Sequence, residues 1–298
     1  MDVPGLQPLP GGMSGETWLS EVAGERTVVR IYAGRSAARG PGAAELDAAV
    51  LAWVGGLVPV PDVLEVRRGD PAQDVPALLV TSYLPGVLLE DLLPDLGEAD
   101  LTRVGTTLGT LLGRLAHVAL PRAGAFRDQT LAIEPFPAAY ADLGSLVDAR
   151  AGDLGWSDAD LARLDAVARD GDALLDRVGR VCLVHSDLNP KNLLVDPETL
   201  AVTGVLDWEY AHAGSPYADL GNLLRFDRHP AYVDAVLAAR EAFVPDPRPD
   251  ALDLARAADL VALVDLAVRK AENPVAARAH DLLLAIARSG DLHAVSSA

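Results

Sequence analysis

The first third of the chain has short apolar runs, separated by turns, that predict β-strands. Residues 17–22 alternate between apolar and polar side chains, as a half-buried strand does, and a glycine turn leads into the β-branched run 27–32. A loop rich in glycine precedes 43–54, where apolar residues recur at helical spacing. A weak strand over 62–67 and a short buried strand over 77–81 follow. The pattern therefore predicts a small β-rich lobe that carries one helix.

Beyond residue 82 the spacing of apolar positions changes to that of helices. A helix is predicted over 101–115, and Ser157 with Asp160 resembles a capping box that begins another helix. Further helices are predicted near residues 230–243, 250–271 and 274–288. The fold class that follows is α+β, with an N-terminal lobe of residues 1–82 and a mainly helical lobe of residues 83–298.

One polar stretch stands out between two apolar runs in the second half of the chain. Residues 183–195 read LVHSDLNPKNLLV, and the following DPETLAVTGVLDW has the pattern of a strand, a turn and a strand. Asp187 and Asn192 belong to the polar stretch, and Asp207 follows the last strand of the hairpin. Three side chains with oxygen donors therefore flank one predicted hairpin.

Composition limits the partners and the location of the protein. The chain has 25 Lys and Arg residues against 43 Asp and Glu, a net charge of −18. Such a charge disfavours nucleic acid and anionic membranes and favours cationic or neutral small ligands. Neither a membrane-spanning apolar segment nor a signal peptide is visible, so we expect a cytoplasmic monomer or homodimer. The single cysteine, Cys182, is expected to be a buried structural thiol.

The chemistry of the three polar side chains favours a metal-dependent transfer reaction. Asp187, Asn192 and Asp207 offer only hard oxygen ligands, which suit Mg²⁺ rather than zinc. A carboxylate that is not a ligand can accept the proton of a substrate hydroxyl. A loop with such a carboxylate, and with an Asn for the metal five residues later, is what phosphoryl transfer requires. A purely structural role in shaping turns stays open for Asp187 and Asn192.

The segments HSDLNPKN and LDWE resemble the two signature motifs of the aminoglycoside phosphotransferase and choline kinase-like family. Its catalytic loop reads H-G-D-x-x-x-x-N and its metal-binding segment reads I/L-D-W/F-E/D, and the resemblance extends over nearly the whole chain. It implies a two-lobed protein-kinase-like fold. It also implies that Asp187 orients and deprotonates the acceptor hydroxyl, while Asn192 and Asp207 bind Mg²⁺ at the nucleotide phosphates. Ser186 stands where the family has glycine, and His185 would pack the loop.

The resemblance further implies a phosphate-binding residue on a strand of the N-terminal lobe. The family has a lysine there, but Lys191 and Lys270 are the only lysines of this chain, and Arg30 occupies the position. Arg30 keeps the positive charge and can bind phosphate with a planar fork of donors. It should pair with an acid on the following helix, either Glu45 or Asp47.

The other nucleotide contacts implied by the resemblance lie in loops. Ser14, in the glycine-containing segment PLPGGMSGET, would donate a hydrogen bond to phosphate. The Ser82 carbonyl and the Leu84 amide would bind the purine of ATP or GTP. Asp219, in GSPYADLGNL, would accept hydrogen bonds from the backbone of the catalytic loop. Lys191 is either a phosphate contact or a solvated surface lysine.

The expected function is Mg²⁺-dependent transfer of the γ-phosphate of ATP or GTP to a small-molecule hydroxyl, with an antibiotic as the expected acceptor and resistance as the result. Acidic residues favour a cationic aminoglycoside or a basic peptide: Asp142, Glu209, Asp227, Asp234 and Glu241. Aromatic residues of the same lobe would suit a macrolide or a nucleoside. A metabolic kinase of choline, homoserine or a sugar is the alternative, and a catalytically silent nucleotide-binding module is a further one. A protein kinase is disfavoured because D-F-G and A-P-E segments are missing from the sequence.

Overall fold

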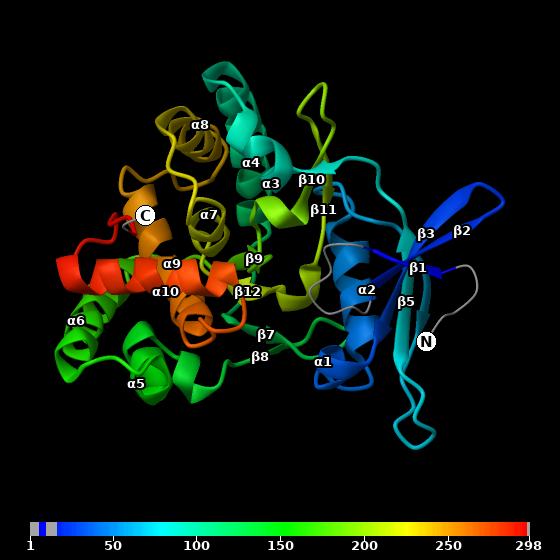
Figure 1. The fold of residues 1–298 in the computed structure, drawn as a ribbon, viewed down its shortest axis with the longest axis horizontal. Coiled ribbons are helices and arrows are strands. Elements are labelled where there is room, and N and C mark those ends of the chain that lie inside the picture. The colour runs from blue at the N-terminus through cyan, green and yellow to red at the C-terminus, as the bar shows by residue number, and fades with distance from the viewer. Residues whose placement is uncertain (1–5, 10–16, 297–298) are drawn as a thin grey trace. The chain divides into compact units, whose positions relative to one another are not determined.

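The structure is a computed structural model that describes residues 6–9 and 17–296, and its contacts divide the chain into two compact units. The first unit contains the described residues up to Gly97, with Phe126–Glu134 and Pro190–Ala211. The second contains Glu98–Ala125, Pro135–Asn189 and the described residues from His212 onward. Figure 1 shows the large sheet of the first unit and the helices of the second. The expected α+β fold class is confirmed, whereas the lobe boundary after residue 82 stays a prediction.

The first unit is built on an antiparallel sheet of five strands. In their order of pairing they are β1 (Leu6–Pro8), β2 (Thr17–Val22), β3 (Glu25–Tyr32), β5 (Ala77–Ser82) and β4 (Val63–Arg67). The strands predicted from alternation are confirmed to within two residues. Strand β3 lies between two neighbours, so Arg30 pairs in register with Thr17 of β2 and with Leu79 of β5.

A helix and a hairpin complete the first unit. The predicted helix is confirmed as α2 (Ala43–Val54), which follows the short α1 (Gly34–Ala37) and packs on β4 and β5. In a second sheet, β10 (Leu193–Val195) pairs with β11 (Val202–Val205) and with β6 (Val87–Leu88). The remaining elements are short: α3 (Leu89–Leu92), η1 (Leu93–Asp95), β8 (Ile133–Glu134), η3 (Pro190–Asn192) and η4 (Trp208–Tyr210).

The second unit contains seven α-helices of different lengths among its described residues. They are α4 (Glu98–His117), α5 (Leu143–Leu154), α6 (Asp158–Leu175), α7 (Ala218–Leu223), α8 (Pro230–Glu241), α9 (Ala251–Ala267) and α10 (Pro274–Ser289), with the 3-10 helix η2 (Ala138–Tyr140) before α5. The predicted capping box is confirmed, because the Ser157 hydroxyl oxygen accepts from the Asp160 amide at 3.2 Å. The helices predicted near 101–115, 230–243, 250–271 and 274–288 are also confirmed.

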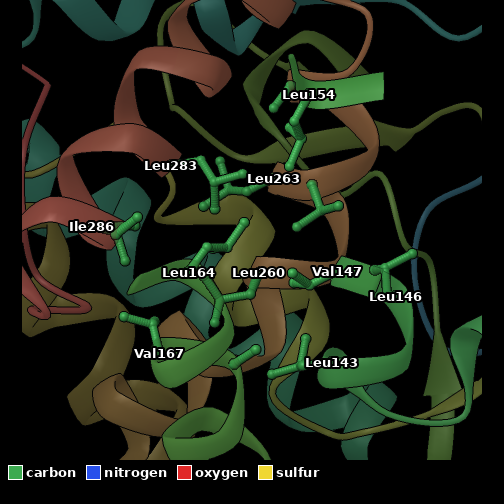
Figure 2. Close-up of a cluster of buried hydrophobic side chains, with 14 of the residues drawn as sticks. Leu143, Leu146, Val147, Leu154, Leu164, Val167, Leu260, Leu263, Leu283 and Ile286 are labelled. Atoms are coloured by element: carbon green, nitrogen blue, oxygen red, sulfur yellow. The ribbon is translucent and has the colours of Figure 1, made fainter. Parts of the chain in front are cut away.

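Close approach of two helices explains a glycine in the middle of α4. A Cβ atom at Gly109 would lie 2.3 Å from the Val236 carbonyl oxygen of α8, far inside the contact distance. Helices α5, α6, α9 and α10 bury a separate cluster of leucines, valines and an isoleucine, which Figure 2 shows in close-up. Burial of these side chains away from water is the main stabilising contribution of this unit.

A small sheet anchors the segment that leads into the polar stretch. Strand β12 (His212–Gly214) pairs with β7 (Gly124–Phe126) and with β9 (Cys182–Val184). Burial raises the pKa of the Cys182 thiol to about 12, in agreement with the structural role expected for it. No helix in the described part of the chain is long and apolar enough to cross a membrane.

Candidate active site

The loop that carries Asp187 begins where β9 ends, and a buried carboxylate holds its backbone. Asp219, on α7, accepts hydrogen bonds from the amides of His185 and Ser186, both at 2.8 Å. Burial raises the pKa of the Asp219 carboxyl, although His185 and the two amides partly oppose that rise. The contact expected between Asp219 and the catalytic loop is therefore confirmed. Its role is structural, because both carboxylate oxygens face the backbone.

Ser186 adopts a backbone conformation that favours glycine. Its φ is +73°, in the left-handed region, where a residue with a side chain costs roughly 1 kcal/mol more than glycine. The Asn222 amide group donates to the Ser186 carbonyl at 3.3 Å, which adds a second contact from α7 to this loop. The backbone angle gives a physical reason for the glycine that the family has at this position.

The Asp187 carboxylate is oriented by a neighbour that the sequence reasoning missed. The Asn189 side chain donates to Asp187 Oδ1 at 2.7 Å and to the Asp187 carbonyl at 3.2 Å. The Asp187 amide donates to Nδ1 of His185 at 3.1 Å, and His185 is fully buried, as a packing role requires. An Asn two residues after an Asp is a known signal for such local hydrogen bonding. That spacing was visible in the sequence.

Asn192 and Asp207 lie at the same end of the β10–β11 hairpin in the first unit. Leu193 pairs with Val205 in the hairpin, and just beyond it the Leu206 amide donates to the Asn192 carbonyl at 2.8 Å. The Asn192 side chain is buried, whereas the Asp207 side chain is 38% exposed. A carboxamide and a partly exposed carboxylate at one hairpin end are hard oxygen donors of the kind that Mg²⁺ prefers. The donor set therefore fits the ion that the family implies.

The protein supplies only part of a coordination sphere at this end of the hairpin. No group of three or more His, Cys, Asp or Glu side chains that could hold a metal ion exists within residues 6–9 and 17–296. Mg²⁺ usually keeps several waters and binds one or two protein carboxylates plus substrate phosphates. A pair such as Asn192 and Asp207 is therefore typical of an ion that arrives with a nucleotide.

Arg30 contacts two carboxylates of the segment after β11. Its Nη1 donates to Asp207 Oδ1 at 3.1 Å, and its Nη2 donates to Glu209. Its guanidinium carbon also lies 5.2 Å from the centre of the Tyr32 ring. All of these groups belong to the first unit. The structure thus places the predicted phosphate-binding arginine beside the predicted metal ligand Asp207.

The expected pairing of Arg30 with an acid of α2 is wrong. Asp47 instead accepts two hydrogen bonds from Arg39, at 2.6 and 2.8 Å, and one from the Tyr32 hydroxyl at 2.6 Å. Glu45 binds Arg68 at 2.6 Å. Arg39, in the loop before α2, presents a complete fork to Asp47, and such a bidentate pair is the strongest kind of ion pair. The sequence offered no way to choose this loop arginine over the strand arginine.

Burial and charge alter the ionisation of this cluster in opposite directions. Burial alone would lower the pKa of Arg30, but Glu209, Tyr32 and Asp207 raise it above its ordinary value. Burial raises the pKa of the Glu209 carboxyl, and the charge on Asp207 adds to that rise while Arg30 and Arg39 oppose it. Burial and the adjacent Asp47 also raise the pKa of Tyr32. Both arginines therefore stay charged, and Tyr32 stays neutral, at physiological pH.

The remaining predicted nucleotide contacts are not tested by the structure. Ser14 lies outside the described residues. Ser82 ends β5, and its hydroxyl oxygen accepts from the Asp62 amide at 2.9 Å. Leu84 lies in the segment between β5 and β6, and Lys191 is an exposed residue of η3. Their roles in nucleotide binding stay predictions.

Several acidic residues that were expected to attract a cationic acceptor already have partners. Asp142 accepts from the Ser145 amide at 2.6 Å and begins α5, and Glu241 contacts Arg240 and the Arg248 amide. Glu209 binds Arg30, as described above. Three of the five acids that were expected to attract a cation are therefore engaged in contacts within the chain.

Comparison with known sequences gives one family and two relatives. A sequence model of the phosphotransferase enzyme family matches residues 5–254. An aminoglycoside 3'-phosphotransferase of Streptomyces fradiae is 34% identical over 191 residues, which are 62% of this chain and 59% of that protein. Acyl-CoA dehydrogenase family member 10 of Mus musculus is 29% identical over 171 residues, which are 55% of this chain and 15% of that protein. The chain thus spans less than two thirds of each of these relatives.

Comparison with solved structures gives the fold. A thermostable mutant of aminoglycoside phosphotransferase APH(4)-Ia, in ternary complex with ADP and hygromycin B, has a TM-score of 0.67 at 20% identity, over 97% of this chain and 95% of that one. The F108L mutant of aminoglycoside 2'-phosphotransferase-IIIa, in complex with GDP, has a TM-score of 0.70 at 16% identity, over 98% of this chain and 94% of that one. The expected two-lobed protein-kinase-like fold is therefore confirmed.

Proposed function

Since the chain belongs to the phosphotransferase enzyme family, we propose that it transfers the γ-phosphate of ATP or GTP to a hydroxyl of a small molecule. The observation that carries the proposal is the orientation of Asp187 by Asn189, at 2.7 Å, on a loop that α7 holds rigidly. Preorganised groups of this kind supply much of the rate in phosphoryl transfer, because the protein does little covalent chemistry itself.

In the proposed reaction, Asp187 accepts a hydrogen bond from the acceptor hydroxyl and takes its proton as the oxygen attacks the γ-phosphorus. One phosphorus–oxygen bond forms to the acceptor, and the bond to the leaving diphosphate breaks. Arg30 binds the inner phosphates with its planar fork of donors. Asn192 and Asp207 would hold Mg²⁺, which supplies neutralisation of charge on the phosphate oxygens when it is bound. The hydrogen bond from Asn189 keeps the Asp187 carboxylate oriented toward the acceptor hydroxyl.

The existing contacts of Arg30 imply an exchange of partners when nucleotide binds. Arg30 now donates to Asp207 and to Glu209, and both Asp207 and Arg30 are needed by the nucleotide complex. We propose that the phosphates take the place of Asp207 on Arg30, which frees that carboxylate for the metal ion. Glu209 stays beside Arg30 and Arg39 and limits the repulsion between these two cations.

An antibiotic is the acceptor that the Streptomyces relative favours, and resistance would follow from its phosphorylation. A metabolic hydroxyl compound is the alternative, and a cluster of arginines in the second unit, described below, favours it. In both cases the reaction class, the proposed nucleotide and the proposed metal are the same.

The proposal is tested by measuring transfer of a phosphoryl group to small molecules. The protein is incubated with Mg²⁺ and either ATP or GTP against a panel of antibiotics and hydroxylated metabolites, and products are found by a mass gain of about 80 Da, the mass of one phosphoryl group. The gain should vanish when EDTA removes the metal. Phosphorylated protein without a small product would instead indicate a protein kinase. Nucleotide binding without any transfer would sink the proposal and leave the silent module.

A further inference from the structure

Three arginines, one from the segment that follows α7 and one each from α9 and α10, contact the backbone of that segment. Arg256, on α9, donates to the Leu224 carbonyl. Arg228 donates to the Arg225 carbonyl at 3.2 Å, and Arg278, on α10, approaches the Phe226 carbonyl at 3.5 Å. We call Arg228, Arg256 and Arg278 the arginine cluster. Helix α9 packs against both α7 and α10 (Figure 1), which explains how residues so far apart in the sequence meet.

A glycine lets α9 approach α7 closely enough for these contacts. A Cβ atom at Gly221 would lie 2.2 Å from the Ala255 carbonyl oxygen and 2.9 Å from Cβ of Asp259. Arg256 and Asp259 therefore reach the segment that follows α7 from one face of α9. Asp259 accepts two hydrogen bonds from Arg225, at 2.7 and 2.9 Å, and both side chains are buried. The charges of that pair cancel, and its two hydrogen bonds fix both side chains beneath the arginines described above.

The arginine cluster itself is not balanced. Within the described chain, none of its members forms an ion pair with a carboxylate. Asp227 interacts electrostatically with Arg228 and Arg278, Asp291 interacts with Arg228, and Asp259, which acts on Arg228 and Arg256, is already paired with Arg225. Arg256 is 4% exposed, and its buried Nε has no hydrogen-bond partner among the described residues. Burial, together with repulsion from Arg228 and Arg225, lowers the pKa of Arg256 to about 10. Positive charge in excess at a buried place is costly unless something pairs with it.

The arginine cluster is connected to the catalytic loop. Asn222, at the end of α7, donates to the Ser186 carbonyl, and its buried Oδ1 has no partner within the described residues. Three residues later, Arg225 interacts electrostatically with Asp187. The five residues that follow α7 therefore run from the neighbourhood of Asp187 to the unpaired cations.

We infer that the acceptor carries an anionic group, a carboxylate or a phosphate monoester, that the arginine cluster binds while the acceptor hydroxyl lies at Asp187. The inference rests on the proposed function and narrows its substrate class. It assigns Arg228 and Arg278, which are partly or fully exposed, to direct binding of the anion. It assigns Arg256 to the buried base of the site.

The inference opposes a polycationic acceptor at this place. An aminoglycoside would bring ammonium groups toward three guanidinium groups, and like charges held together at an interface repel one another. The structural alternative is that the arginines only bind the carbonyl groups at the end of α7, as basic side chains often do at helix ends. That alternative predicts a change in stability alone, with no preference for anions.

The first experiment measures binding by the nucleotide-free full chain, at low ionic strength, with matched pairs of probes. 3-Hydroxybutyrate is compared with 3-hydroxybutyramide, glycerol 3-phosphate with glycerol, and hygromycin B serves as the polycation. We expect the anion of at least one pair to bind about ten-fold more tightly than its neutral partner, and salt to weaken that preference. The pair with the larger ratio identifies carboxylate or phosphate as the group. Equal binding within both pairs, or tighter binding of hygromycin B than of either anion, overturns the inference.

The second experiment uses Arg228→Gln and Arg278→Gln, with Arg169→Gln as the matched control. Arg169 is an exposed arginine of α6 that pairs with Asp165. Each cluster variant should weaken the anion by about ten-fold or more and leave its neutral partner unchanged, because a charge-assisted hydrogen bond is lost. The control should change neither. Variants that lower the melting temperature but keep the preference for the anion would support the purely structural role and overturn the inference.

A mass-spectrometric assay of the same probes separates this inference from the proposed function. A gain of about 80 Da on hygromycin B, without any preference for anions, overturns the inference and leaves the kinase proposal intact. If anions bind through the arginine cluster but no probe and no panel compound is phosphorylated, the kinase proposal is contradicted and the inference about the anion is not.

Discussion

The two units of this protein treat their arginines in opposite ways. In the first unit, Arg30 and Arg39 face three carboxylates: Asp47, Asp207 and Glu209. In the second unit, the members of the arginine cluster form no ion pair of their own among the described residues and interact at longer range with Asp227, Asp259 and Asp291, of which Asp259 is already paired with Arg225. Each of these two groups of arginines lies in a unit that carries residues of the proposed reaction. We therefore relate the difference in their pairing to the ligand that each unit binds.

The difference indicates which ligand each group expects. A cluster of three carboxylates and two guanidinium groups can release an arginine to phosphate and a carboxylate to a cation, while ion pairs remain among its other members. The arginine cluster donates to backbone carbonyls and has no carboxylate in an ion pair within the described chain, so an incoming anion would supply the partner charge. The first unit is thus suited to a nucleotide with its metal, and the second to an anionic acceptor.

The largest expected effect concerns Asp187, whose charge interacts with Arg225 beside the arginine cluster. Replacing Asp187 with Asn should lower kcat by about 100- to 10,000-fold, because the general base is lost, and should leave nucleotide affinity nearly unchanged. Steady-state kinetics and a nucleotide titration measure the two quantities separately. Near-full turnover of Asp187→Asn would refute the assignment of this residue.

A second prediction concerns the balanced pair beneath the arginine cluster. Asp259→Asn should lower the free energy of unfolding by about 3–5 kcal/mol, because the buried Arg225 loses the carboxylate to which it donates two hydrogen bonds. Urea denaturation measures the loss. The exposed pair of Arg169 and Asp165 provides the control, since Arg169→Gln should change stability by no more than about 1 kcal/mol. Equal effects of the two variants would show that burial does not distinguish the pairs.

A third prediction concerns the balanced cluster of the first unit. Arg30→Gln should weaken nucleotide binding by about ten-fold or more and lower the free energy of unfolding by about 1–3 kcal/mol, since Asp207 and Glu209 lose a charged donor. Arg39→Gln should affect stability in a similar way but nucleotide binding much less, because Arg39 faces Asp47. Identical nucleotide affinities of the two variants would contradict the separate roles given to these arginines.

The smallest effect is a pH dependence within the unbalanced cluster. Burial raises the pKa of the Asp227 carboxyl, although Arg278 and Arg228 oppose that rise. A carboxyl whose pKa is higher in the folded protein contributes stability that is complete below about pH 4, the ordinary pKa of Asp, and that is lost as the pH rises through the raised value. The stability of the wild type relative to Asp227→Asn should therefore fall as the pH rises from about 4. A difference that stays constant with pH would contradict this assignment.

Local features of the chain were predictable because their cause is local. The helix over Ala43–Val54 and the strands around Arg30 follow from the spacing of apolar side chains, which acts over a few residues. The capping contact of Ser157 was visible for the same reason. Asn189 could have been found as well, since its contact to Asp187 spans only two residues.

Pairings between distant segments were not predictable. The sequence suggested that Arg30 would pair with an acid of α2. Arg39 forms the ion pair with Asp47 instead, because its loop lies directly before that helix. Alternatives within one lobe differ only in the path of a loop, and periodicity carries no information about that path.

By itself, the sequence determined the α+β class, the position of most helices and strands, and the polar side chains of the catalytic loop and the hairpin. Tertiary structure alone decided which charges are paired. Arg228, Arg256 and Arg278 are separated by 50 residues of chain in total, and only the close packing of α7, α9 and α10 brings them to one stretch of backbone. Secondary structure depends on short-range spacing, whereas the balance of charge at a site depends on which elements pack together.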